Sequence, residues 1–226
     1  MQGSFTKLFS NGPSGIDETS EPLGPYFFIQ KKGAAGGQRF TEDSVILSDF
    51  LLPLNDDDTV IDLGTGTGII PHLIAWKSAV KKIIGVEVME VPAGMARRNV
   101  VLNNLSGRIE IIRRDYRDLT GVFSNGSFSV VVSNPPYFKA GSARISPLIE
   151  RAVARNEVYG NLDDMLCAAK YLAGAYGRIC FVFTLVRLEE TLKSVKANGL
   201  KIKRLFPVRR TGAGGQGVFL MEASMK

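Results

Sequence analysis

An asparagine, two prolines and a tyrosine, Asn134 to Tyr137, follow the apolar run 129–133 and suit chemistry on a flat amino group. Such a group attacks poorly because its lone pair is delocalised. The side-chain oxygen of Asn134 and the carbonyl of Pro135 can accept hydrogen bonds from it and draw it towards tetrahedral geometry. Pro135 and Pro136 stiffen the loop, and Tyr137 offers a ring for stacking. We expect all four residues to be catalytic, although Asn-Pro-Pro is also an ordinary turn at the end of a strand.

A glycine-rich turn lies about seventy residues upstream, in Asp62-Leu63-Gly64-Thr65-Gly66-Thr67-Gly68. It separates the β-branched run 59–61 from a helix-like segment, 69–75, so backbone N–H groups at a helix N-terminus would face a ligand. Dinucleotide enzymes use a related loop, but their glycines are spaced differently. Asp62 would obstruct a pyrophosphate and suits a cationic methionine group. We expect S-adenosylmethionine as the cofactor, held by Asp62, Gly64, Thr65, Gly66 and Gly68.

Two further acids follow the next two expected strands. Glu87 ends the segment 82–87, and Asp115 follows the segment 108–112. Each of them by itself could be a solvated surface acid, but open α/β sheets bind ligands along the carboxyl ends of their strands. We expect Glu87, with the adjoining Val88, at the ribose hydroxyls, and Asp115 with Tyr116 at the adenine. Asn134 is expected at the cofactor as well as at the acceptor.

The elements that position these residues alternate between strands and helices. The expected strands are 59–62, 82–87, 108–112, 129–133, 178–183, 200–207 and 218–223, and the expected helices are a segment from about 41, 69–75, 162–173 and 188–197. This order favours a Rossmann-like, doubly wound α/β fold with a mostly parallel, seven-stranded sheet. Because the last two strands form a hairpin, one antiparallel strand should lie near the C-terminal edge.

Composition limits the domain organisation and the class of function. Residues 1–25 are rich in Gly, Pro and Ser, and we expect a mobile N-terminal segment followed by one domain, 26–226, with 26–30 a short strand or lid. No membrane span or signal peptide is expected, which favours the cytoplasm. One histidine, His72, and two cysteines make a metal site and a Ser-His-acid hydrolase poor candidates. We interpret His72 as structural, and Cys167 and Cys180 as core thiols.

Positive charge gathers in the last third of the chain. Residues 1–150 carry 15 basic and 16 acidic side chains, whereas residues 151–226 carry 13 basic and 6 acidic ones. Basic clusters occur at 201–204 and 209–210, and a basic hairpin tip beside a cofactor cleft suits a phosphate backbone, although such runs can also be merely solvated. We predict RNA contacts at Lys139, Arg151, Arg155, Arg209 and Arg210, with Tyr137 under the base. RNA is preferred to duplex DNA, whose reading usually needs an extra module.

Taken together, Asp62 to Gly68, Glu87, Asp115 and Asn134 to Tyr137 resemble the class I S-adenosylmethionine-dependent methyltransferases that carry an Asn-Pro-Pro-Tyr motif. The segments Arg39-Phe40-Thr41 and Ala154-Arg155-Asn156-Glu157 resemble the bacterial tRNA adenine-N6 methyltransferases, which modify an adenine beside the anticodon of a valine tRNA. The resemblance covers about residues 26–225. It implies methyl transfer to the N6 amine of adenine in RNA, most simply tRNA. It also implies that Phe40 and Thr41 close over the cofactor, although helix capping and hydrophobic anchoring explain these two residues equally well.

Three alternatives stay open. The same motif serves methylation of the glutamine amide of release factors, by enzymes that typically carry an additional N-terminal helical domain. A guanine-N2 methyltransferase of ribosomal RNA would use similar amine chemistry. A non-catalytic RNA-binding protein could retain the fold without the activity. For the adenine-N6 interpretation, no obligate protein partner is inferred.

Overall fold

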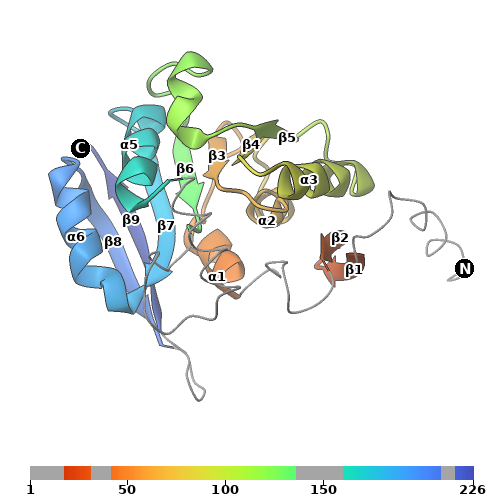
Figure 1. Ribbon diagram of the computed structural model, residues 1–226, viewed down its shortest axis with the longest axis horizontal. Coiled ribbons are helices and arrows are strands. Elements are labelled where there is room, and N and C mark those ends of the chain that lie inside the picture. The colour runs from red at the N-terminus through yellow and green to blue at the C-terminus, as the bar shows by residue number, and fades with distance from the viewer. Residues whose placement is uncertain (1–17, 32–41, 136–159, 210–216) are drawn as a thin grey trace, which may run out of the picture.

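The computed structural model describes residues 18–31, 42–135, 160–209 and 217–226, in which strands and helices alternate along the chain (Figure 1). The strands are β1 (Glu18–Leu23), β2 (Tyr26–Lys31), β3 (Thr59–Leu63), β4 (Lys82–Glu87), β5 (Ile109–Arg113), β6 (Val130–Ser133), β7 (Arg178–Thr184), β8 (Lys201–Val208) and β9 (Val218–Ser224). The α-helices are α1 (Glu42–Phe50), α2 (Ile69–Lys77), α3 (Glu90–Leu102), α5 (Leu162–Ala173) and α6 (Leu188–Ala197), and two short 3-10 helices are η2 (Tyr116–Gly121) and η3 (Leu185–Arg187).

Seven of the strands form one sheet in the order β5-β4-β3-β6-β7-β9-β8. The pairs β4–β5, β3–β4, β3–β6 and β6–β7 are parallel, and β9 is antiparallel to both of its neighbours, β7 and β8. The expected fold is therefore confirmed, including one antiparallel strand next to the edge that β8 forms.

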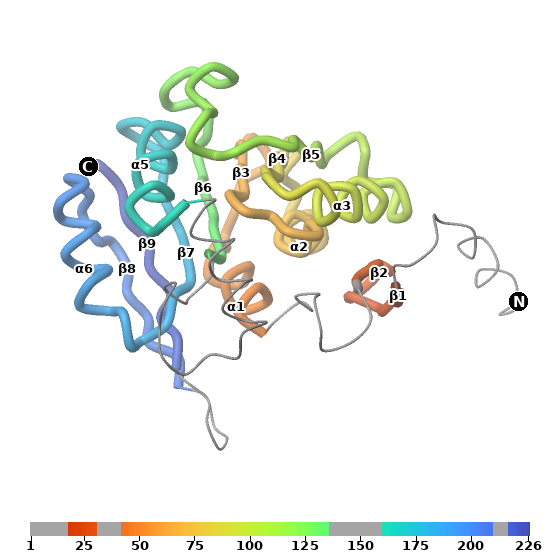
Figure 2. Tube along the Cα trace, in the orientation of Figure 1, coloured from red at the N-terminus to blue at the C-terminus, as the bar shows by residue number. Residues whose placement is uncertain are grey.

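Helices cover both faces of this sheet (Figures 1 and 2). Alternate side chains of β6 illustrate the two layers: Val130 and Val132 join the core under α1, α2 and α3, whereas Val131 joins the core under α5 and α6. All three valines are fully buried, as expected for a parallel strand that is covered on both faces. Within the described part of the chain, no helix has both the length and the apolar character needed to cross a membrane.

The N-terminal region differs from the prediction. β1 and β2 pair as an antiparallel hairpin, which lies beside α3 and apart from the main sheet (Figure 1). The strand at Tyr26–Lys31 agrees with the sequence, but Glu18–Leu23 lies within the segment expected to be mobile. Most of its side chains are at least partly exposed, and its sequence, ETSEPL, shows no alternation of apolar and polar residues. The strand forms by backbone pairing with β2, so hydrophobic periodicity could not reveal it.

Candidate active site

The candidate site lies at the carboxyl ends of β3 and β6, the two neighbouring strands at which the chain reverses its direction across the sheet. From β3 the chain proceeds outward to β4 and β5, then returns to place β6 on the other side of β3. Such a switch point opens a crevice between the loops that leave the two strands, and ligands of open α/β sheets bind there. The loop after β3 is the glycine loop, and the loop after β6 begins with Asn134.

The backbone of the glycine loop is folded back onto β4. The N–H groups of Gly64 and Thr65 both donate to the carbonyl of Val86, each over 2.9 Å. Gly64, Gly66 and Gly68 have φ values of +74°, +58° and +88°, a left-handed region that glycine enters without strain. A Cβ atom placed on Gly64 or Gly66 would meet no described atom within 4 Å, so these two glycines leave open space beside the loop.

Asp62 is a buried carboxylate at the end of β3. It has no exposed surface, and neither of its oxygens has a hydrogen-bond partner among the described residues. Burial raises the pKa of Asp62 to about 7; the neighbouring Thr65 hydroxyl, which does not reach hydrogen-bond geometry, offsets part of the increase, and the nearby charge of Glu87 adds to it. A buried acceptor without a partner is costly, so Asp62 fits the cationic ligand group that the sequence assigned to it.

Glu87, at the end of β4, holds the glycine loop from the other side. One carboxylate oxygen accepts from the N–H of Gly66 over 2.9 Å, and the other accepts from the N–H of Met89, also over 2.9 Å. Burial raises the pKa of this carboxyl, and these backbone N–H groups counteract part of the increase. Each oxygen has a second lone pair, so Glu87 can still accept bonds from ligand hydroxyls.

Asn134 lies directly after β6 and is held between two elements. The hydroxyl of Ser133 donates to the carbonyl of Leu63 over 2.8 Å, which joins the end of β6 to the end of β3. The amide nitrogen of Asn134 donates to the hydroxyl of Ser44 on α1 over 3.2 Å. This contact helps to orient the Asn134 amide.

Asp115 and Tyr116 follow β5, as predicted, but Asp115 is already engaged. Its carboxylate accepts from the backbone and the guanidinium of Arg117, with a shortest contact of 2.6 Å. Burial opposes ionisation, but the contacts with Arg117 outweigh it and hold the pKa of Asp115 below its usual value. Burial raises the pKa of Tyr116 to about 12, and a Cβ on Gly160 would overlap its hydroxyl. Val88 is half-buried beside Glu87.

Two asparagines on α3, which the sequence analysis did not identify, clamp the hairpin onto the domain. Asn99 is fully buried, and its amide exchanges hydrogen bonds of 2.7 and 3.0 Å with the backbone N–H and carbonyl of Ile29. Asn103 does the same for Phe27, over 3.0 and 2.8 Å. Residues four apart on a helix lie on one face, so the two amides act on β2 as a neighbouring strand would.

Asn99 also reaches the glycine loop, because its amide nitrogen donates to the carbonyl of Thr67 over 3.1 Å. His72 makes a parallel connection. Its Nδ1 lies 2.7 Å from the carbonyl of Gly68, and its ring makes edge contacts with Tyr26 and Phe28 of the hairpin. Burial lowers the pKa of His72. The hairpin, α3 and the glycine loop are thus one connected unit.

Several predicted site residues lie outside the described part of the chain: Phe40, Thr41, Pro136, Tyr137, Lys139, Arg151, Arg155 and Arg210. The structure brings together Asp62, the glycine loop, Glu87 and Asn134. Arg209 is exposed just beyond the end of β8. One expectation outside the site was wrong, since Cys167 is exposed on α5, whereas Cys180 is buried.

The fold and the arrangement of these residues at the ends of β3, β4 and β6 define the class I methyltransferase architecture, and solved structures share the fold. TYW2 from M. jannaschii was solved in complex with AdoMet. Its match with this protein spans 93% of this chain and 87% of the TYW2 chain, with a TM-score of 0.62 at 17% identity. The match with TrmN from Thermus thermophilus spans 80% of this chain and 48% of the TrmN chain, with a TM-score of 0.57 at 21% identity. The model of the methyltransferase small domain matches residues 26–163. The chain belongs to this methyltransferase small domain family, which confirms the class inferred from the sequence.

Curated relatives are similar over much of the chain. A tRNA1(Val) (adenine(37)-N6)-methyltransferase from Porphyromonas gingivalis is 32% identical over 151 residues, which are 66% of this chain and 58% of the relative. An enzyme of the same name from Aliivibrio fischeri is 24% identical over 189 residues, 84% of this chain and 78% of the relative. The chain thus spans less than two thirds of the length of the Porphyromonas relative.

Proposed function

We propose that this protein transfers a methyl group from S-adenosylmethionine to the N6 amine of an adenine in tRNA, beside the anticodon. One observation carries the proposal: the Ser133–Leu63 hydrogen bond joins the end of the strand that precedes Asn134 to the end of the strand that precedes the glycine loop. An acceptor for an amine and a loop for a methionine cofactor are therefore adjacent. The names of the curated relatives support adenine in tRNA as the acceptor.

The residues around the crevice fit the cofactor. Asp62, buried and without a partner among the described residues, would accept from its ammonium group, and Glu87 from its ribose hydroxyls. Gly64 and Gly66 leave room for close approach to the loop. The cofactor would supply a methyl group activated by a sulfonium. Phe40, Thr41, Thr65, Gly68, Val88, Asp115 and Tyr116 complete the proposed set of cofactor contacts.

The protein's own part in the reaction is to orient the acceptor. The amide oxygen of Asn134 and the carbonyl of Pro135 would accept from the adenine amine, while Tyr137 stacks on the extruded base and Pro136 stiffens the loop. No strong general base is needed, because the nitrogen sheds its proton readily once it is methylated. Alignment of the two reacting groups then supplies most of the rate.

A tRNA acceptor requires contacts with its phosphates, and we assign these to Lys139, Arg151, Arg155, Arg209 and Arg210. The excess of basic residues after position 150 supports this assignment. Such a protein would act in the cytoplasm, where its tRNA is found, and the proposal invokes no obligate protein partner.

The test is a transfer assay with labelled S-adenosylmethionine and RNA from cells that lack this protein, followed by nucleoside analysis. We expect N6-methyladenosine in the tRNA fraction. Label in guanosine or in protein would keep the cofactor and move the acceptor to guanine-N2 or glutamine-amide chemistry. Failure to bind S-adenosylmethionine, with retained binding of RNA, would identify a non-catalytic RNA-binding protein.

A further inference from the structure

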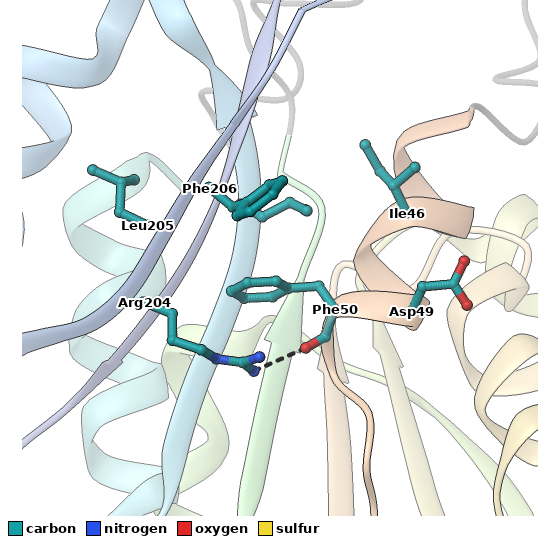
Figure 3. A pocket seen from close by; sticks show the side chains of 7 residues that line it. Ile46, Asp49, Phe50, Arg204, Leu205 and Phe206 are labelled. Carbon is teal, nitrogen blue, oxygen red and sulfur yellow. Dashed lines mark hydrogen bonds between the residues drawn. The ribbon is translucent and has the colours of Figure 1, made fainter.

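An open groove of about 650 Å³ lies between α1 and the last two strands of the sheet (Figure 3). It is lined by Ile46, Asp49 and Phe50 of α1, by Arg204, Leu205 and Phe206 of β8, and by Leu220 of β9. On this face α1 packs mainly against β7 and β9. The edge strand β8 lies next to β9, beyond the part of the sheet that α1 covers.

One wall of the groove is fixed before any ligand arrives. The guanidinium of Arg204 lies 4.2 Å from the centre of the Phe50 ring and donates to the Phe50 carbonyl over 2.8 Å (Figure 3). It also pairs with Glu222 over 2.6 Å, which compensates its charge. Arg204 therefore holds Phe50 in place, and a ligand would meet a rigid aromatic wall.

The composition of β8 is unusual for an edge strand. Lys201, Lys203 and Pro207 are residues that protect an exposed edge from pairing with another strand. Phe206 and Leu205 work against that protection, since they are 61% and 39% exposed. An edge that needed only protection would not carry an exposed phenyl ring, so Phe206 points to binding.

The charge of this strand indicates the kind of partner. From residue 200 to residue 209 the chain has four basic and no acidic side chains. Arg204 is paired with Glu222, whereas Lys201, Lys203 and Arg209 make no ion pair within the described part of the chain. Cations along the same strand as an exposed aromatic ring form a combination that suits single-stranded nucleic acid, by stacking and by phosphate contacts.

We propose that this groove binds an unpaired stretch of the RNA acceptor, with a base stacked on Phe206 and phosphates paired with Lys201, Lys203 and Arg209. The inference rests on the proposed function. Helix α1 connects the two places, because Ser44 contacts Asn134 and Ile46, within the same helical turn, lines the groove.

The test compares the affinity of the full chain for tRNA, measured by filter binding over a series of salt concentrations. Phe206→Ala should weaken binding roughly tenfold. The double substitution Lys201→Ala, Lys203→Ala should reduce the slope of log K against log salt by about 1.4, as expected for two phosphates of a single strand. Binding of S-adenosylmethionine should be unchanged in both proteins, which shows that they are folded.

Tyr176→Ala is the matched control for Phe206→Ala, because Tyr176 is 86% exposed and lies before β7, at the end of the strands where β8 begins and away from Phe206. It should bind tRNA as the wild type does. If the wild type methylates tRNA but the β8 variants bind it normally, this inference is wrong and the proposed function stands. If the wild type neither binds nor methylates RNA, both fail. If Phe206→Ala instead dissociates a dimer in sedimentation and leaves tRNA binding intact, the groove seats a second copy.

Discussion

At the scale of single residues, Asn134 carries the proposed chemistry, and its removal should affect turnover far more than cofactor binding. Asn134→Ala should lower kcat by about 10²–10³-fold, the usual cost of one preorganised polar contact to the reacting group. The dissociation constant for S-adenosylmethionine, measured by calorimetry, should stay near that of the wild type. Single-turnover kinetics on tRNA give the rate.

Ser44→Ala is the matched control for this prediction. It removes the hydroxyl that orients the Asn134 amide but leaves the amide oxygen in place. We expect a loss of only a few-fold in kcat, on the order of one hydrogen bond. Equal losses of turnover and cofactor affinity in Asn134→Ala would contradict the assigned role.

Asp62 should make stability depend on pH in a direction opposite to that of a salt-bridged acid. Its pKa in the folded protein is about 7, well above the ordinary value of 3.8, so the folded state binds this proton more tightly than the unfolded state. The stabilisation is complete below about pH 4 and is lost as pH rises towards 7. In urea titrations without ligand, the wild type should lose stability relative to Asp62→Asn over this window, by at most about 1.4 kcal/mol per pH unit.

The same carboxylate predicts the pH dependence of cofactor binding. Deprotonated Asp62 attracts an ammonium group, so the wild type should bind S-adenosylmethionine more tightly at pH 8 than at pH 6. Asp62→Asn should bind weakly at both. A parallel pH profile in wild type and variant would show that another group is responsible.

The sequence predicted these two residues because each stands at a recognisable position, the end of an apolar run followed by glycines or prolines. It could not predict what Asp115 contacts, since the ion pair with Arg117 depends on the turn into η2. The role of Asn99 was also beyond reach. Its partner Ile29 is 70 residues away, in a hairpin whose first strand has no apolar pattern. The cofactor and substrate assignments of individual residues stay predictions.

At the scale of elements, the clamp between α3 and the hairpin should support the glycine loop through one of its two asparagines. Asn99 contacts both Ile29 and the loop carbonyl of Thr67, whereas Asn103 contacts the hairpin at Phe27 without reaching the loop. Asn99→Ala should therefore weaken S-adenosylmethionine binding, by roughly fivefold for one lost hydrogen bond. Titration calorimetry, in which S-adenosylmethionine is added to the ligand-free protein, measures this affinity.

Asn103→Ala separates support of the loop from attachment of the hairpin. It should cost about 1 kcal/mol of stability in urea unfolding and leave cofactor affinity unchanged. Equal weakening by both variants would mean that the hairpin as a whole, and not the Thr67 contact, supports the loop.

The elements themselves were predictable where composition and burial agree. Both faces of the sheet are covered by helices, and the strands at its centre are accordingly apolar runs rich in β-branched residues. The sequence predicted all four of these strands, β3, β4, β6 and β7. α3 was not identified, because its buried face is built from small side chains such as Ala93 and Ala96. The exposure of β8 could not be foreseen either, since it depends on how far α1 extends across the sheet.

At the scale of the whole molecule, β9 should be the strand whose core side chain matters most for cooperative stability. Phe219 is fully buried and makes edge contacts with Phe181 and Phe183 of the neighbouring strand. Phe219→Ala should destabilise the protein by about 3–5 kcal/mol, measured by urea unfolding. Phe206→Ala, one strand away on the exposed edge, should change stability by no more than about 0.5 kcal/mol.

The position of β9 also has a consequence for synthesis of the chain on the ribosome. β8 precedes β9 in the sequence, yet within the described sheet it is hydrogen-bonded to β9, which lies between it and β7. A nascent chain that has completed β8 thus still has an unfilled place beside β7, and β8 has no strand to join. The sheet closes only when residues 218–224 leave the exit tunnel, so a chain stalled before this point would present two open strand edges to chaperones.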